Sequence, residues 1–509
     1  MRIGLMTKHL FQHHQAPGQF ARLVVLGFAF VATSVALHGQ QSIRLTIHWD
    51  KTVVVSKSTP TLQVVVNPPL RHGEPLSAAS YKAVKDLSAD YVRYVPWLPY
   101  PRLAVAELEP PTSEKTSWDF SLIDPMTKDF LAATEGHPTV MNFSTMPTWL
   151  FKTDKPVTYP ADSNQLVWNY TQGTELRDPT GKEMAGYYER LLSWYTKGGF
   201  TDELGVRHES GYHYSFPIWE VLNEVDSEHS MTPEDYTKRY DMIVEAIHRV
   251  SPETKFMGLA LALPRDHPEF FEYFLNPANH KPGIPLDYIS YHFYASPTPP
   301  QTIANWQYTF FDQADGFLNA VRYIEIIRKR LSPATKTDLD ELGVILPTDN
   351  TDADKVPPPA AYYNLAGSLY AYLFIELSRL QIDIIGESQL VGYPTQFPSV
   401  SMMNWTNNKP NPRFWVLKLI KDSFHSGDTL VDTSLESPDV EAQAFLTPAG
   451  HKLLLANKRD RVVEVELPNA EKASALTVDE STGDGPARNV KPAEGKIKLD
   501  PFAVTVVSW

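Results

Sequence analysis

Two glutamate residues stand near the ends of apolar, strand-like segments, where their carboxyl groups could act together. Glu224 follows the segment 218–222, and Glu341 lies within the segment 337–344. Cleavage of a glycosidic bond needs two facing carboxyl groups, one protonated to donate to the leaving oxygen and one ionised to attack or stabilise the anomeric carbon. Most of the 60 acidic residues are expected to be solvated surface groups, so position is what selects this pair as catalytic candidates.

Polar residues near the two glutamates include a possible substrate contact and two alternative catalytic acids. Asn223 precedes Glu224, and its amide could hydrogen-bond a sugar 2-hydroxyl, an interaction that strengthens in the transition state. Asp338 and Asp340 are the alternatives to Glu341 as the catalytic carboxyl group on this segment. Because side chains alternate along a strand, we expect Asp340 to point to the opposite side from Glu341.

His292 and Tyr294 lie two residues apart, and we therefore expect them on one face of the strand predicted over 286–293. A tyrosine hydroxyl that donates to a carboxylate keeps that carboxylate ionised. The alternative for His292 is a packed core residue. No second ligand stands at metal-binding spacing from His292 and no His-Glu-x-x-His motif occurs, so we predict no metal and no cofactor.

Arginine and tryptophan side chains complete the candidate substrate contacts. Trp97, Trp149 and Trp405 follow predicted strands, and an aromatic face at such a position could stack on a sugar ring; packing in loops or the core is the alternative. Arg93 could reach a sugar hydroxyl or a uronate carboxylate. Arg93 could instead pair with Glu220. Glu220 is expected to point to the same side as Glu224 but from further inside the barrel, and we favour this ion pair over a catalytic role for Glu220.

Strand-like and helix-like segments alternate strictly between residues 61 and 425. Alternation of this kind indicates right-handed βαβ units, and eight units close a (β/α)8 TIM barrel of the α/β class, whose chemistry lies at the C-terminal ends of its strands. The first strand ends in Asn-Pro-Pro-Leu rather than in a glycine-rich phosphate turn, which argues against a doubly wound sheet. The predicted strands are 62–67, 91–95, 139–143, 218–222, 255–261, 286–293, 337–344 and 382–390, and the predicted helices are 78–87, 122–133, 183–197, 233–250, 268–275, 317–331, 362–380 and 412–424.

The pattern changes after the barrel to short alternating runs separated by turns, which is typical of an all-β sandwich. We assign residues 426–509 to this accessory domain and expect the alternating segment 40–60 to add strands to it.

Residues 1–39 have the layout of a secretory signal peptide. Basic residues and no acidic residue occupy positions 1–22, an uncharged run covers 23–36, and small residues follow, with cleavage expected after Ala36 or Gly39. The run is short for a membrane span, although an uncleaved anchor is the alternative. We therefore predict export, with no stable membrane association after cleavage.

The composition excludes several classes of function. A net charge of −14 leaves no basic excess for phosphates, so we predict no nucleic-acid partner. The absence of cysteine removes disulfides, thiolate metal sites and cysteine nucleophiles. The paired glutamates instead indicate an oligosaccharide or glycoside substrate, and the oligomeric state stays open.

Several of these segments resemble glycoside hydrolases of clan A and, more narrowly, family 39, which contains β-xylosidases and α-L-iduronidases. The resemblance is carried by the segments 118–124, 146–149, 219–226 and 287–294. It implies that Glu224 is the acid/base and Glu341 the nucleophile of a retaining enzyme. It also implies that the loops of Trp149 and Trp405 form sugar-binding platforms.

The resemblance points most directly to a β-xylosidase. A glycosidase for uronic-acid or arabinose-containing glycans is the alternative within the class. A non-catalytic carbohydrate-binding barrel is the alternative outside it, although such a protein would have no need for both glutamates.

Overall fold

The computed structural model describes residues 42–509, apart from 168–169, 171–172, 348–357 and 393–397. The predicted leader, 1–39, lies outside the described residues. Among the residues that are described, no helix is both long enough and apolar enough to cross a membrane.

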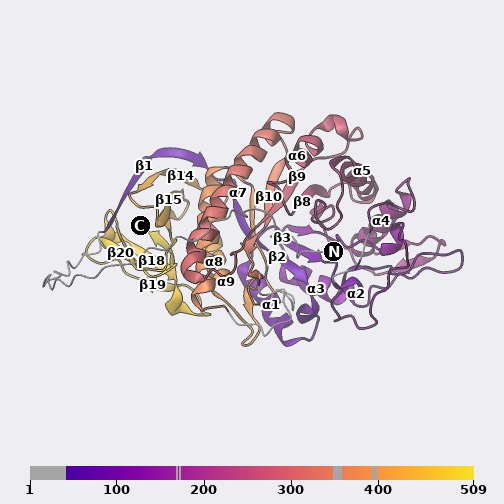
Figure 1. Cartoon of the computed structure of the whole chain (residues 1–509), viewed down its shortest axis with the longest axis horizontal. Coiled ribbons are helices and arrows are strands. Elements are labelled where there is room, and N and C mark those ends of the chain that lie inside the picture. Colours follow the sequence, from indigo (N-terminus) through magenta and orange to yellow (C-terminus); the bar gives the residue numbers. More distant parts are fainter. Residues whose placement is uncertain (1–41, 168–169, 171–172, 348–357, 393–397) are drawn as a thin grey trace, which may run out of the picture. The chain divides into compact units, whose positions relative to one another are not determined.

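Eight parallel strands form a closed barrel, which confirms the predicted fold (Figure 1). The strands follow one another around the barrel in chain order, because each right-handed helical connection places the next strand beside the previous one. Their residues are almost entirely buried, since a parallel strand is covered on both faces. The barrel strands are β2 (Thr59–Val66), β3 (Val92–Pro96), β4 (Thr139–Met141), β7 (Ile218–Glu220), β8 (Lys255–Leu261), β9 (Tyr288–Ala295), β10 (Lys336–Val344) and β11 (Ile384–Glu387).

Within the described part of the chain, eight helices of seven or more residues alternate with these strands, as predicted. Thr232 caps α5 by accepting a hydrogen bond from the Asp235 amide at 3.2 Å, and Pro233 occupies the first turn. Most predicted boundaries differ by a few residues, but one helix was predicted much too short. The helix expected from residue 317 begins at Ile303, where Thr302 and Asn305 form a capping box, and continues through Gly316. The helices are α1 (Pro75–Leu87), α3 (Ile123–Ala133), α4 (Lys182–Thr196), α5 (Pro233–Val250), α6 (Pro268–Phe274), α7 (Ile303–Leu331), α8 (Ala361–Arg379) and α9 (Pro412–Ser423), with a short α2 at Pro101–Ala104.

An extra residue interrupts β10 at the C-terminal end of the barrel. Asp338 pairs with Ser290 of β9, but the next recorded partner of His292 is Glu341, so three steps along β10 match two along β9. The same shift separates β10 from β11. A bulge of this kind changes the direction in which the following side chains point.

The C-terminal residues form a nine-stranded all-β domain, and β1 from the start of the described chain lies within it (Figure 1). β1 pairs antiparallel with β14 and parallel with β17. The order is β19-β18-β21-β16-β15-β14-β1-β17-β20. The strands are β1 (Ile43–Val55), β14 (Thr429–Leu435), β15 (Val440–Thr447), β16 (Gly450–Asn457), β17 (Val463–Glu466), β18 (Ser474–Val478), β19 (Arg488–Val490), β20 (Lys496–Leu499) and β21 (Val504–Ser508); two small hairpins are β5 (Gly199–Thr201) with β6 (Arg207–Glu209) and β12 (Met403–Asn404) with β13 (Lys409–Pro410).

Candidate active site

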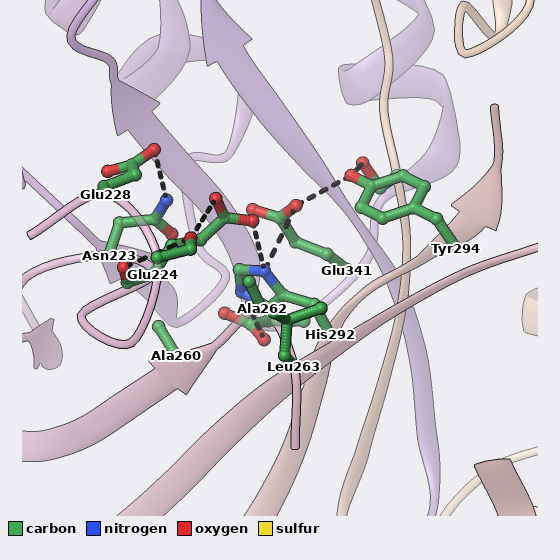
Figure 2. A network of polar contacts seen from close by, with 12 residues as sticks. Asn223, Glu224, Glu228, Ala260, Ala262, Leu263, His292, Tyr294 and Glu341 are labelled. Atoms are coloured by element: carbon green, nitrogen blue, oxygen red, sulfur yellow. Dashed lines mark hydrogen bonds and ion pairs between the residues drawn. The ribbon is translucent and has the colours of Figure 1, made fainter. Parts of the chain in front are cut away.

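Glu224 and Glu341 lie side by side at the C-terminal mouth of the barrel (Figure 2). Glu224 follows β7 in a left-handed turn, with φ of 67° at Leu222 and 42° at Glu224 itself. Its amide donates to the Ala260 carbonyl at 2.9 Å, which ties this turn to β8. A non-glycine residue in this region is strained, and such positions often occur at functional sites.

The two carboxyl groups converge on His292. His292 Nδ1 lies 3.2 Å from Glu224 Oε1 and 3.5 Å from Glu341 Oε2. One ligand atom from each of these three residues lies within 4.8 Å of the others. The Tyr294 hydroxyl donates to Glu341 Oε2 at 2.7 Å, so His292 and Tyr294 both face the pair, as their spacing predicted.

The Arg93 side chain is buried next to the pair and has almost no contact with solvent. Its side chain is 1% exposed, and its guanidinium contacts Glu341 Oε1 at 2.6 Å and Asn223 Oδ1 at 2.7 Å. The predicted pairing with Glu220 is present at 2.6 Å. We expected Arg93 to bind substrate, but its burial under these groups corrects that role to support of the carboxylates from inside the barrel.

Asp340 also reaches this interior, and the expectation that it points away from Glu341 is wrong. Its carboxylate lies 2.9 Å from Arg93 Nε and 3.5 Å from His292 Nε2. The extra residue in β10 is the cause, because it breaks the simple alternation between Asp338 and Glu341. Asp340 and Glu341 therefore contact the same two cationic side chains.

Burial and neighbouring charges set the protonation of the site. Burial raises the pKa of Glu224, and the charge of Glu341 adds to this, although His292 acts in the opposite direction. Burial would lower the pKa of His292, but Glu341 and Asp340 raise it well above its usual value. Burial also raises the pKa of Glu220, to about 7, despite the guanidinium beside it. The arrangement thus favours a protonated Glu224 and a charged His292.

The loop after β7 holds Asn223 and Asp226 in defined positions. The Asn223 amide nitrogen lies 3.3 Å from Glu228 Oε1, while its oxygen accepts from Arg93. Asp226 accepts hydrogen bonds from the amides of Ala262 at 3.0 Å and Leu263 at 2.8 Å. Asp226 therefore fastens the loop to the end of β8.

The three predicted tryptophan contacts are all partly buried. Trp97 donates its indole N–H to Glu228, beside Asn223. Trp149 donates to the Glu107 carbonyl at 2.8 Å, and the Arg177 guanidinium lies 4.6 Å from its ring centre, so one ring face is occupied. Trp405 packs against the main hydrophobic core next to Asn404.

Some residues of the site were not predicted. Glu228 is the most prominent, and its position four residues after Glu224 was the available signal. The others are small or amide side chains that contact Glu220, Arg93, Tyr294 or one another, and their types carry little signal. They are Gln63, Asn142, Ser290 and Ser388.

The cluster of Glu224, His292 and Glu341 has donor atoms close enough to hold a cation. Its donor set of two carboxylates and one imidazole is compatible with a divalent metal ion. The raised pKa of His292 opposes this use, because only a neutral imidazole binds metal.

Two family models match parts of the chain. Residues 199–339 match the family model of glycosyl hydrolases family 39, a span that contains Glu224 and ends just before Glu341. Residues 438–507 match the C-terminal immunoglobulin-like domain of D-apionate lactonase. None of the curated proteins compared with the chain matches it.

Solved glycosidase structures share the fold of the whole described chain. The GH51 arabinofuranosidase from Xanthomonas axonopodis pv. citri is 12% identical with a TM-score of 0.62, covering 92% of this chain and 99% of its own. The GH51 α-L-arabinofuranosidase from Thermotoga petrophila RKU-1 is 15% identical with a TM-score of 0.58 (92% and 100%). A GH30 endoxylanase from Clostridium papyrosolvens C71 is 12% identical with a TM-score of 0.55 (92% and 100%). Residues 199–339 thus resemble glycosyl hydrolases family 39, and the described chain has the fold of glycosidases from families 51 and 30.

Proposed function

We propose that the chain is a retaining glycosidase in which Glu224 is the acid/base and Glu341 the nucleophile. The observation that carries this proposal is the spacing of the pair, with one oxygen of each carboxyl group within 4.8 Å of the other. Retaining enzymes hold the two carboxyl groups about 5–5.5 Å apart, whereas inverting enzymes leave about 6.5–9.5 Å for a water molecule. The difference in environment between the two carboxyl groups supports the assignment of roles.

In the first step, a carboxylate oxygen of Glu341 attacks the anomeric carbon as the glycosidic C–O bond breaks. The proton of Glu224 passes to the leaving oxygen, which departs as an alcohol. In the second step, Glu224 takes a proton from water, and the water oxygen displaces Glu341 from the anomeric carbon. Arg93 and Tyr294 each hold one oxygen of Glu341, which stabilises the departing carboxylate.

A neutral pentoside is the substrate class that we propose, with a β-xyloside first and an α-L-arabinofuranoside second. The similarity to family 39 supports the former, and the arabinofuranosidase folds support the latter. A uronate fits less well, because Arg93 is buried beneath the carboxylates and is not available to bind an acid group. We also propose that the protein is exported through its predicted leader.

A screen of aryl glycosides tests the substrate class: β-xyloside, β-glucoside, β-glucuronide, α-iduronide and α-arabinofuranoside. Sugar lactones belong in the same screen, because the C-terminal domain resembles one from a lactonase. Turnover of a lactone but of no glycoside would contradict the proposed reaction. Turnover confined to uronides would contradict the substrate class.

Two variants test the mechanism. Glu224→Gln should abolish turnover of unactivated substrates while leaving activity on substrates with good leaving groups, which need no proton; equal loss on both would exclude the acid/base role. Glu341→Ala should be inactive and regain activity with azide. Failure of azide to rescue a folded variant would count against the nucleophile.

A further inference from the structure

We propose that Glu228 is a third carboxyl group of the substrate site and that it hydrogen-bonds the sugar hydroxyl adjacent to the one bound by Asn223. This inference rests on the proposed function. It assigns substrate recognition to a residue that the two-carboxyl mechanism does not use.

The turn after β7 brings Glu228 to the same side as Glu224. The amides of Ser227 and Glu228 both donate to the Glu224 carbonyl, at 2.9 and 2.7 Å. Figure 2 shows the Glu228 side chain beside Asn223, at the edge of the group that contains both catalytic glutamates. The carboxyl group is therefore part of the mouth of the barrel.

Only one oxygen of Glu228 is used by the described protein. Oε1 accepts from the Trp97 indole and lies 3.3 Å from the Asn223 amide nitrogen. Oε2 has no recorded hydrogen bond to any described residue, and no basic side chain of the described chain forms an ion pair with this carboxyl. The two N–H groups thus fix the orientation of the carboxyl and leave its second oxygen available to a ligand.

The surroundings of Glu228 suit a sugar hydroxyl. Burial and the neighbouring Glu224 raise its pKa well above the usual value, which favours the protonated form of the carboxyl group. A protonated carboxyl group has both a donor and an acceptor, as a hydroxyl does. A group needed only to accept from Trp97 and Asn223 could be an amide and would avoid the cost of a buried acid.

The position next to Asn223 identifies which hydroxyl is contacted. If Asn223 binds the 2-hydroxyl, its neighbours on the ring are the reacting C1 and the carbon that carries the 3-hydroxyl. The catalytic pair occupies the C1 side. Glu228, whose Oε1 lies 3.3 Å from the Asn223 amide nitrogen, is therefore placed for the 3-hydroxyl.

Binding measurements test this assignment without turnover. The ligands are phenyl 1-thio-β-xyloside and phenyl 1-thio-α-arabinofuranoside with their 2-deoxy and 3-deoxy analogues, and the proteins are the wild type, Glu228→Ala, Glu228→Gln and Asn223→Ala. Glu234→Ala, an exposed glutamate in the first turn of α5, is the matched control. Calorimetry gives each Kd, and far-ultraviolet circular dichroism with thermal unfolding checks that each variant is folded.

For the wild type, loss of the 3-hydroxyl should weaken binding about 10-fold or more, because it leaves the acid without a partner. In Glu228→Ala the parent ligand should bind that much more weakly, and the 3-deoxy analogue should lose no further affinity. Glu228→Gln should retain most of the discrimination, and Asn223→Ala should remove discrimination at the 2-hydroxyl. The Glu234→Ala control should match the wild type.

Two outcomes would overturn the assignment. Equal weakening of all ligands in Glu228→Ala, with 3-deoxy discrimination intact, would show a purely structural role. A wild type that binds neither thioglycoside would count against both proposals. Binding with the predicted discrimination but without turnover of any O-glycoside would contradict the catalytic proposal alone.

Discussion

Replacement of Arg93 by methionine is the most informative perturbation of the site. The guanidinium is almost completely buried and contacts three carboxyl groups, those of Glu220, Asp340 and Glu341, at 2.6, 2.9 and 2.6 Å. Methionine preserves much of the side-chain volume and removes the charge. Removal of one partner from a buried ion pair costs about 3–5 kcal/mol, because the remaining charge is left uncompensated.

The loss of folding stability in Arg93→Met should depend on pH. Without the guanidinium, the pKa of the buried Glu220 carboxyl group should rise further above its value in the unfolded chain. Groups of this kind stabilise the fold fully below their unfolded pKa, near 4, and this stabilisation is lost as pH rises through the folded value. Glu220 indicates the pH range of this loss, because burial raises its pKa to about 7 even beside Arg93. The deficit in unfolding free energy should therefore be about 1 kcal/mol or less at pH 4 and about 3–5 kcal/mol at pH 8.

Urea unfolding across this pH range measures the deficit, and the pH dependence of kcat/KM measures its effect on catalysis. The acid limb of the kcat/KM profile should move to higher pH, because the proposed nucleophile Glu341 loses its contact with the guanidinium. Arg328→Met is the matched control, because Arg328 forms a buried pair with Glu325 at 2.6 Å near the opposite end of β10. The control should lose stability without moving the acid limb. An Arg93→Met deficit that is equal at all pH values, with an unmoved acid limb, would refute the electrostatic reasoning.

Four further predictions concern the groups around the pair. Tyr294→Phe removes a hydrogen bond to the ionised Glu341 and should lower kcat about 10- to 150-fold, with little change in KM, as steady-state kinetics would show. Because burial raises the pKa of Glu224, the basic limb of the kcat/KM profile for substrates with poor leaving groups should lie above the usual glutamate range. Glu224→Gln should abolish this limb, and a limb that persists in the variant would exclude Glu224 as the titrating group. Trp149→Ala and Trp405→Ala should each raise KM about 2- to 10-fold through lost stacking, and an unchanged KM would remove that tryptophan from the substrate site. Activity should survive dialysis against EDTA, whereas loss restored by an added divalent ion would assign a metal to the glutamate–histidine cluster.

The barrel was predictable from sequence because its strands are buried on both faces and therefore read as uninterrupted apolar runs. β8 illustrates this, since its observed bounds, Lys255–Leu261, are those of the predicted segment. Glu224 and Glu341 were candidates for a related reason, because a barrel gathers side chains from the ends of its strands. The placement of both at the mouth follows from the closure of the sheet.

The parts that sequence reasoning missed depend on local departures from regular structure. Asp340 reaches Arg93 and His292 because β10 contains an extra residue, and strict alternation cannot anticipate a bulge. Glu228 lies in a loop, where no strand parity constrains its side chain. Its place in the site depends on a contact with Trp97 from a different loop, so neither segment alone predicts it.

The site gathers more carboxyl groups than cations, and this excess bears on how Glu224, the proposed general acid, stays protonated. Within the described residues, Arg93 and His292 are the cationic groups in direct contact with the cluster. Although burial acts to raise it, the pKa of Asp340 is lowered, because both cations contact that carboxylate. The remaining acids cannot all be ionised in so small a volume, and protonation falls on those with raised pKa values. These are Glu220, Glu224, Glu228 and Asp338. The proton on Glu224 is thus a property of the whole cluster, which is why loss of a buried arginine should be visible in the pH profile of the reaction at the barrel mouth.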